Sequence, residues 1–198
     1  MTRLHIGSGP QILPGWINVD NVAYDGVDRV LDVRDGLPFE NVSFIFAEHF
    51  IEHLAYPDAL AFLRECRRAL REDGVLRLST PNLDWVWASH YRLDLDEKQQ
   101  MQACFAINGA FRGWGHQFLY NERTLRATLL DAGFAEIARR DYGQSPHAEL
   151  HGLERHAKSS DEGYPSHILI VEASERGGKA PDALESFRSA FLRDLMLR

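Results

Sequence analysis

The chain has 198 residues, of which 44% are hydrophobic and 26% are charged, and its formal net charge is −7. This size and composition are typical of one soluble globular domain with one core. The acidic balance argues against a nucleic-acid partner, because a protein that binds phosphates needs a basic surface.

Apolar segments and cysteines limit the class of protein further. The longest apolar runs, such as residues 168–171, have the length of a strand, so we expect no membrane partner. Residues 1–6 lead directly into a predicted strand, which leaves no room for a signal peptide and favours a cytoplasmic location. Cys66 and Cys104 form no CxxC pair, and we expect two free thiols rather than a disulfide or a metal pair.

Short apolar segments separated by turns dominate the start of the chain. They predict strands over residues 3–7, 16–20, 29–33 and 42–47, and the last is apolar almost throughout, as in a strand buried on both faces. Only residues 10–15 separate the first two strands, whereas a crossover between parallel neighbours normally needs about a dozen residues or more. Either this crossover is a single turn, or the second segment is not a regular strand.

The middle of the chain alternates between helical and strand patterns. Pro57 opens a helix with apolar residues near helical spacing, and Gly74 stands where this helix would end. A strand is predicted over residues 75–79, followed by an irregular helical pattern over residues 83–112. Asn121 is expected to cap the next helix.

The last part of the chain completes the pattern and adds a tail. The helix after Asn121 stops at Gly133, and residues 136–142 and 167–173 predict the last two strands. After a linker, apolar residues recur at helical spacing and predict a C-terminal amphipathic helix. They are Leu184, Phe187, Phe191 and Leu195. This helix either docks on its own domain or forms a homodimer. Strands that alternate with helices predict an α/β fold with a mostly parallel sheet.

The turn after the first strand is the most informative motif. Gly7-Ser8-Gly9 lets the backbone approach a ligand, and Asp20 ends the second strand with a carboxylate suited to ribose hydroxyls. Open α/β sheets hold the adenosine part of a cofactor in this way. A lone GxG turn or an acidic residue at a strand end is more often an ordinary loop feature. Whether these residues form a cofactor site therefore depends on the order of the motifs that follow.

A set of motifs in a fixed order resembles the class I S-adenosylmethionine-dependent methyltransferases, most closely their small predicted-methyltransferase branch. The motifs are HIGSGP, WINVD, LDVRDGLPF, FIFAEHFIEHL and ECRRALREDGVLRLSTPN. The resemblance is close over residues 3–82 and looser up to the final strand. It implies a single Rossmann-like doubly wound sheet, mostly parallel with an antiparallel last strand, plus a helical and loop insert. The methyltransferase domain would span residues 1–175, and the linker and C-terminal helix residues 176–198.

The resemblance implies S-adenosylmethionine as the cofactor and assigns a set of residues to it. The set is Gly7, Ser8, Gly9, Asp20, Asp32, Val33, Ala47, Glu48 and His49. The three residues of the turn would lie against the methionine part and the ribose, and Asp20 would accept both ribose hydroxyls. Asp32 would meet the adenine amino group beside the Val33 backbone. Residues 47–49 would face the sulfonium and amino-acid end.

The chain departs from the family pattern in the first loop and before the first strand. Residues 11–13 stand where the family often has a third glycine, and the helices that often cover the cofactor have no counterpart before the first strand. We therefore expect the lid and the acceptor site to come from residues 83–120 and 143–165. Glu52 and His53 match a helix start that is usually structural in the family.

Methyl transfer from a sulfonium is an in-line displacement, in which the protein mainly aligns the acceptor and excludes water. A base is needed only when the acceptor must lose a proton, as a hydroxyl does, and histidine suits that role near neutral pH. His116, in a glycine-rich turn, is our first candidate for the base, and His49 is the second. The ordinary alternatives are a surface turn residue for His116 and cofactor packing for His49.

Trp114, His147 and His151 are the candidate substrate residues. Trp114 shares the glycine-rich turn with His116. His147 and His151 are four residues apart, so a helix would place them on one face, as a metal pair needs. We expect an acceptor-binding segment here and no metal, with a polar loop at the entrance as the ordinary alternative.

These observations favour an S-adenosylmethionine-dependent methyltransferase that acts on a hydroxyl of a small molecule, such as a saccharide or a secondary metabolite. The first alternative is a non-catalytic S-adenosylmethionine-binding or scaffold protein. The second is an NAD-linked oxidoreductase, which needs a glycine turn that runs into a long helix. Pro10 and Pro14 oppose that helix.

Overall fold

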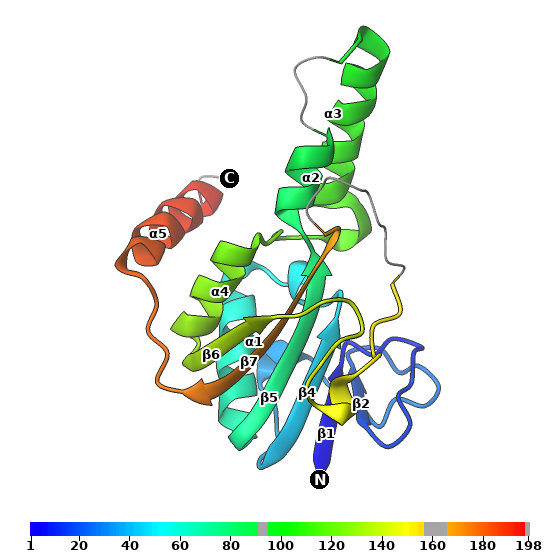
Figure 1. Ribbon diagram of the computed structural model, residues 1–198, viewed down its shortest axis with the longest axis vertical. Coiled ribbons are helices and arrows are strands. Elements are labelled where there is room, and N and C mark those ends of the chain that lie inside the picture. The colour runs from blue at the N-terminus through cyan, green and yellow to red at the C-terminus, as the bar shows by residue number, and fades with distance from the viewer. Residues whose placement is uncertain (91–94, 157–165, 197–198) are drawn as a thin grey trace.

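The computed structural model describes residues 1–90, 95–156 and 166–196. Its centre is one seven-stranded sheet with the order β3-β2-β1-β4-β5-β7-β6 (Figure 1). The strands are β1 (Thr2–Ile6), β2 (Ile17–Asp20), β3 (Arg29–Val30), β4 (Val42–Glu48), β5 (Leu70–Pro81), β6 (Phe134–Arg139) and β7 (Ile168–Arg176). Neighbours are parallel from β3 to β5, whereas β7 runs antiparallel to β5 and β6. The predicted mostly parallel α/β sheet with an antiparallel last strand is confirmed.

Long helices lie against one face of the sheet and extend one end of the molecule. They are α1 (Tyr56–Ala69), α2 (Leu83–His90), α3 (Glu97–Arg112), α4 (Glu122–Asp131) and α5 (Asp182–Met196). Figure 1 shows α1 and α4 beside the sheet, α5 outside α4, and α2 and α3 projecting beyond the end of β5. The main core includes Ile6, Ile45, Leu63 and Leu125. It forms because the apolar stripes of α1 and α4 meet the continuous apolar runs of the strands.

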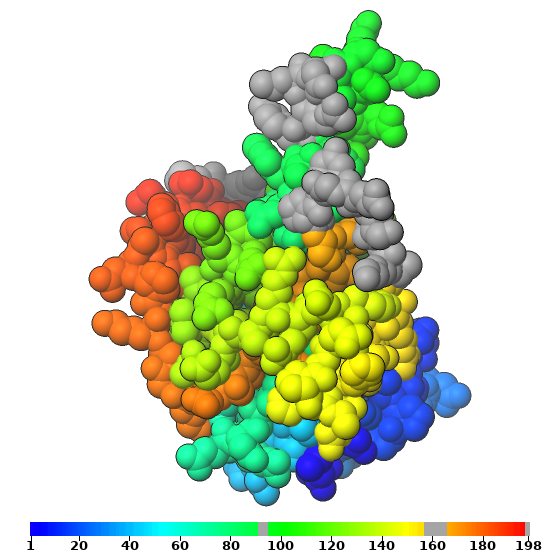
Figure 2. Space-filling model, viewed as in Figure 1, coloured from blue at the N-terminus to red at the C-terminus, as the bar shows by residue number. Residues whose placement is uncertain are grey.

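The opposite face of the sheet is covered by residues 140–156, which we call the cover segment. A smaller apolar cluster there joins Leu13, Trp16, Phe44 and Phe46 to Leu150 of this segment. Leu150 belongs to the 3₁₀ turn η4 (Ala148–Leu150). Figure 2 shows the cover segment lying across the front of the sheet. An irregular segment therefore excludes water from this face.

The connection between β1 and β2 is a turn without a helix, so the first of the two predicted alternatives holds. The strands pair in parallel, with Leu4 opposite Ile17. The buried Asn18 side chain holds the turn: its Oδ1 accepts the Leu13 N–H (2.9 Å), and its Nδ2 donates to the carbonyls of Leu13 and Trp16. These bonds satisfy backbone groups that a crossover helix would otherwise satisfy internally.

Replacing Asn18 by alanine is expected to lower the free energy of unfolding by about 1–3 kcal/mol, because the buried Leu13 N–H and carbonyl lose their partners. Urea denaturation followed by circular dichroism measures the change. Asn21→Ala, at an exposed position just after β2, is the matched control and should change stability by less than about 0.5 kcal/mol. Equal effects of the two substitutions would contradict this role of Asn18.

The structure corrects two predicted element ends. The third strand stops at Val30 rather than at residue 33, because Asp32 caps the 3₁₀ turn η1 (Val33–Asp35). Helix α1 ends at Ala69, and Gly74 lies inside β5, so the prediction that Gly74 ends the helix is wrong. A Cβ atom on Gly74 would lie 2.8 Å from the Val42 carbonyl oxygen. The glycine instead permits the close approach of β4 and β5.

The predicted cap of α4 is confirmed, because Asn121 Oδ1 accepts the Thr124 N–H at 2.9 Å. The chain leaves this helix at Gly133, whose φ of +98° suits glycine. Strand β6 follows at once and ends at Arg139, earlier than residue 142. The irregular helical pattern over residues 83–112 forms α2 and α3, and residues 91–94 lie outside the described residues.

Helix α5 forms as predicted and docks in part on its own domain. Arg188 Nη1 donates to Asp131 Oδ2 (2.6 Å), and the ring centroids of Phe191 and Phe118 lie 5.5 Å apart. Phe187 remains 71% exposed. Homodimerisation stays a prediction.

The two cysteines are free thiols, as predicted. Cys66 lies in the core, where burial raises the pKa of its thiol, whereas Cys104 is exposed. None of the helices within the described residues has the length and hydropathy needed to cross a membrane.

Candidate functional site

A pocket of about 490 Å³ opens at the ends of β1, β2 and β4, and we call it the carboxyl-edge pocket. It lies where the strand order reverses between β1 and β4, the position at which open α/β sheets bind ligands. Several of the predicted cofactor residues line it together. They are Gly7, Asp20, Asp32, Val33 and His49. The tertiary structure therefore brings together residues at or just after the ends of four strands, β1 to β4.

The remaining predicted cofactor residues stand next to the pocket rather than in its lining. Ser8, in the turn after β1, and Ala47, in β4, are almost fully buried. Gly9 donates its N–H to Asp20 Oδ2 at 2.8 Å. Glu48 Oε1 accepts the N–H of Arg155 at 2.9 Å, so it ties the cover segment to the end of β4. These residues support the shape of the pocket.

Asp20 is held at the pocket by two backbone N–H groups. Its Oδ2 accepts from Gly9 and its Oδ1 accepts from Val22, at 2.8 and 2.9 Å. Gly7 adopts a φ of +65°, and a Cβ there would lie 2.3 Å from the ring of Phe50. Only glycine fits this close approach. The turn and the carboxylate are thus oriented before any ligand binds.

Asp32 lines the pocket and is already paired. Its side chain accepts from the Arg34 backbone N–H at 2.9 Å and from the Arg34 guanidinium. These hydrogen bonds lower the pKa of Asp32 to about 2. An adenine amino group that reaches Asp32 would therefore share an ionised carboxylate with Arg34.

His49 lines the pocket at the end of β4 in an uncommon backbone conformation, with a φ of +47°. Its backbone N–H donates to the Ser79 carbonyl at 2.9 Å, and its Nδ1 lies 3.1 Å from Glu52 Oε1. The His156 ring of the cover segment packs on it, with centroids 4.0 Å apart. The cover segment thus reaches the pocket through Arg155 and His156.

The glycine-rich turn after α3 contributes less to the pocket than its sequence suggests. Gln117 lines the pocket, whereas His116 does not. The His116 ring packs against His53, which does line the pocket, with ring centroids 5.1 Å apart. Trp114 is 82% exposed. The structure does not place Trp114 in the pocket, because its φ of +55° within η3 (Gly113–Gly115) turns the chain there.

His147 and His151 also lie away from the pocket. The η4 turn between them is a single 3₁₀ turn, so no α-helix places both rings on one face. His147 packs on Phe44 with centroids 5.6 Å apart, near the start of β4, and His151 is exposed. Neither residue lines the carboxyl-edge pocket, and their contact with an acceptor stays a prediction. Residues 157–165, the rest of the predicted lid, lie outside the described residues.

The face under the cover segment holds a buried ion network that the sequence does not predict. Arg77 is fully buried, and it donates from Nε to Glu154 Oε1 and from Nη1 to Glu172 Oε1, both at 2.6 Å. Arg140 Nε also donates to Glu172. The alternation Leu-Arg-Leu-Ser over residues 76–79 was the available signal, because it places polar side chains on one face of β5.

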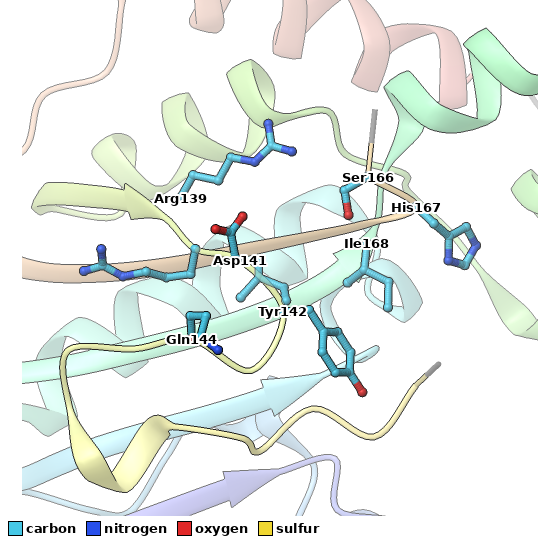
Figure 3. A pocket seen from close by; sticks show the side chains of 9 residues that line it. Arg139, Asp141, Tyr142, Gln144, Ser166, His167 and Ile168 are labelled. Atoms are coloured by element: carbon cyan, nitrogen blue, oxygen red, sulfur yellow. The ribbon is translucent and has the colours of Figure 1, made fainter. Parts of the chain in front are cut away.

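A second cavity of about 470 Å³, the sheet-face pocket, lies beside this network. Figure 3 shows its walls, which come from the end of β6 and the start of β7. They include Arg139, Asp141, Tyr142, Gln144, Ser166, His167 and Ile168. It lies away from the carboxyl-edge pocket and holds none of the predicted site residues.

Comparison with known proteins identifies relatives of this fold. A family profile described as a methyltransferase domain matches residues 3–138. PigF solved with SAH is similar at 16% identity, with a TM-score of 0.52 over 88% of this chain and 50% of that chain. The apo S-adenosylmethionine-dependent methyltransferase SibL is similar at 11% identity, with a TM-score of 0.54 over 89% and 51%.

DhpI in complex with SAH is similar at 14% identity, with a TM-score of 0.52 over 90% of this chain and 78% of that chain. At these identities the likeness shows the fold. The chain spans about half the length of PigF and SibL. No curated protein matches the chain.

Proposed function

Because the chain belongs to the methyltransferase domain family, we propose that it binds S-adenosylmethionine and transfers the methyl group to a small-molecule acceptor. Its sheet has the class I methyltransferase order with an antiparallel last strand. The observation that carries the proposal is the carboxyl-edge pocket, in which Asp20 stands beside the Gly7–Gly9 turn. A carboxylate at this place accepts ribose hydroxyls, and the turn leaves room for the rest of the cofactor.

The cofactor supplies the activated methyl carbon when it is bound. In our proposal Asp20 orients the ribose, Asp32 and the Val33 backbone meet the adenine, and His49 faces the reacting end. We place the proton acceptor at His49 rather than His116, because only His49 lines the pocket. His49 Nε2 has no hydrogen bond among the described residues. The His156 ring covers it and must move aside for an acceptor.

The acceptor that we propose is a hydroxyl of a saccharide or a secondary metabolite. A histidine at the reacting end supports this choice, since a hydroxyl must lose its proton during transfer. The acidic net charge of −7 disfavours a nucleic acid. An NAD-linked reaction is disfavoured because the β1–β2 connection has no helix whose N-terminus could hold a pyrophosphate.

Calorimetric titration with S-adenosylhomocysteine and with NAD tests the proposal. We expect S-adenosylhomocysteine to bind and, at a hundred times its Kd, to raise the free energy of unfolding by about 2.7 kcal/mol. NAD should bind far more weakly or not at all. If neither ligand bound, the cofactor site would be wrong. Tight binding with no turnover in an acceptor screen would favour the non-catalytic alternative.

A further inference from the structure

Three metal-ligating side chains converge at one side of the carboxyl-edge pocket. A carboxylate oxygen of Glu52 and one ring nitrogen each of His53 and His116 all lie within 4.8 Å of one another. Ligands of a single zinc-like cation lie about 3–4 Å apart, given bond lengths of about 2.0–2.2 Å. The spacing of the three atoms is close to this range. We call these residues the Glu52–His53–His116 cluster.

Backbone hydrogen bonds hold the two parts of the cluster together, although they are far apart in the sequence. The N–H groups of Gln117 and Phe118 both donate to the Glu52 carbonyl, at 2.7 and 3.2 Å. Gln117 Nε2 donates to the His53 carbonyl at 2.9 Å. The residue that follows His116 is therefore fixed against the turn η2 (Ile51–His53). The backbone and Gln117 therefore fix the positions of these residues. Contacts among the Glu52, His53 and His116 side chains are not needed to bring them together.

The tautomer of His116 suits a metal ligand. Its Nδ1 lies 2.7 Å from the Ala110 carbonyl oxygen, which can only accept a hydrogen bond. Nδ1 therefore carries the proton, and Nε2 keeps a lone pair. A histidine that donates one ring N–H to a carbonyl and offers the other nitrogen is the usual arrangement at metal sites.

Glu52 provides an independent indication of a cation. Its side chain is 0% exposed, and its Oε2 accepts from Thr80 Oγ1 at 3.0 Å. Its Oε1 makes no hydrogen bond among the described residues, although His49 Nδ1 lies 3.1 Å away. A buried carboxylate without a cation is costly. Glu52 already has His49 as an ion-pair partner, and a bound metal ion would add a permanent positive charge beside the carboxylate.

We propose that the Glu52–His53–His116 cluster binds one divalent transition-metal cation that in turn binds the acceptor. Two imidazole nitrogens and one carboxylate favour zinc, manganese, iron or cobalt over magnesium or calcium, which prefer oxygen ligands. Three protein ligands leave coordination positions open, as in catalytic rather than structural sites. His53 also lines the carboxyl-edge pocket, so the cluster borders the place where we propose the transfer.

This proposal rests on the proposed function and narrows its acceptor. A cation with open positions binds a hydroxyl that has a second oxygen beside it, as in a vicinal diol or an α-hydroxy acid. Coordination lowers the pKa of that hydroxyl, so its proton passes to His49 more readily. The oxygen then forms the bond to the methyl carbon, and the carbon–sulfur bond breaks with both electrons on sulfur. The sulfonium charge is thereby neutralised.

Calorimetric titration of the EDTA-treated chain with MnCl₂ and, separately, with ZnCl₂ tests the site. We expect one cation per chain. His116→Ala and Glu52→Gln should each weaken binding at least about 10-fold. His90→Ala removes a histidine outside the cluster and should leave binding unchanged. Because Glu52 is buried, thermal unfolding must show that each variant is folded, and the more exposed His116 keeps the test valid if Glu52→Gln fails to fold.

The possible outcomes distinguish an error in the proposed metal site from an error in the proposed cofactor site. If the folded chain bound neither cation, or if binding survived His116→Ala, the metal site would be wrong and the ions would be held by surface groups. S-adenosylhomocysteine titrated in EDTA gives the second measurement. Its binding without cation binding would contradict only the metal site. Cation binding without S-adenosylhomocysteine binding would contradict only the cofactor site.

Discussion

Replacing Arg77 by leucine is expected to lower the free energy of unfolding by about 3–5 kcal/mol. The guanidinium is fully buried and donates to Glu154 and Glu172, so leucine would leave Glu154 in the interior without a cation and Glu172 with Arg140 as its remaining partner. It would also remove the bond from Arg77 Nη1 to the Gln144 carbonyl (3.0 Å), which holds the cover segment on the sheet. Urea denaturation followed by circular dichroism measures the loss.

Arg139→Leu is the matched control for this substitution. Arg139 lies on the edge strand β6 and pairs with Glu122, and both side chains are substantially exposed. An exposed ion pair contributes at most about 1 kcal/mol. A loss below about 1 kcal/mol for Arg77→Leu would show that the cover segment is held by its apolar contacts instead.

The same network predicts how stability changes with pH. Burial alone would raise the pKa of Glu172, but hydrogen bonds from Ser145, Arg140 and Arg77 outweigh it and lower the pKa below its ordinary value of 4.5. A carboxyl whose pKa is lower in the folded state stabilises the fold above its unfolded pKa and loses this effect as the pH falls. The difference in the free energy of unfolding between the wild-type chain and Arg77→Leu should therefore become smaller as the pH falls below 4.5.

Replacing Asp20 by alanine is expected to raise the Kd for S-adenosylhomocysteine at least about 100-fold. Two hydrogen bonds from ribose hydroxyls to a charged acceptor contribute about 1.5–3 kcal/mol each, and each 1.4 kcal/mol changes the affinity tenfold. The substitution also frees the N–H groups of Gly9 and Val22, which loosens the turn and acts in the same direction. Calorimetric titration measures the affinity.

The control for Asp20 is Asp25→Ala, which removes the same charge from an exposed position outside the pocket lining. The affinity of this variant for S-adenosylhomocysteine should stay within about twofold of the wild-type value, since surface substitutions away from a site have small effects. The melting temperature of Asp20→Ala should show that the variant is folded. If a folded Asp20→Ala variant bound S-adenosylhomocysteine with unchanged affinity, Asp20 would not be part of the cofactor site.

Local sequence patterns predict most of the fold. The strands at residues 3–7 and 42–47 and the cap at Asn121 were predicted well, because an apolar run or a capping side chain acts within a few residues. The prediction for Gly74 is wrong because the sequence does not distinguish a glycine that ends a helix from a glycine packed against a neighbouring strand. Only the Val42 carbonyl, 2.8 Å from where a Cβ would lie, distinguishes the two.

The sheet, the glycine turn and the acid at position 20 can be predicted from the amino-acid sequence, because each depends on neighbouring residues or on an ordered set of motifs. Which histidines lie together depends on the folded chain. The tertiary structure brought His116 to Glu52 and His53, and it left His147 at the start of β4. It also buried Arg77 with two carboxylates from distant segments. Such contacts join residues that no local pattern relates, so their chemistry becomes visible only when the chain is folded.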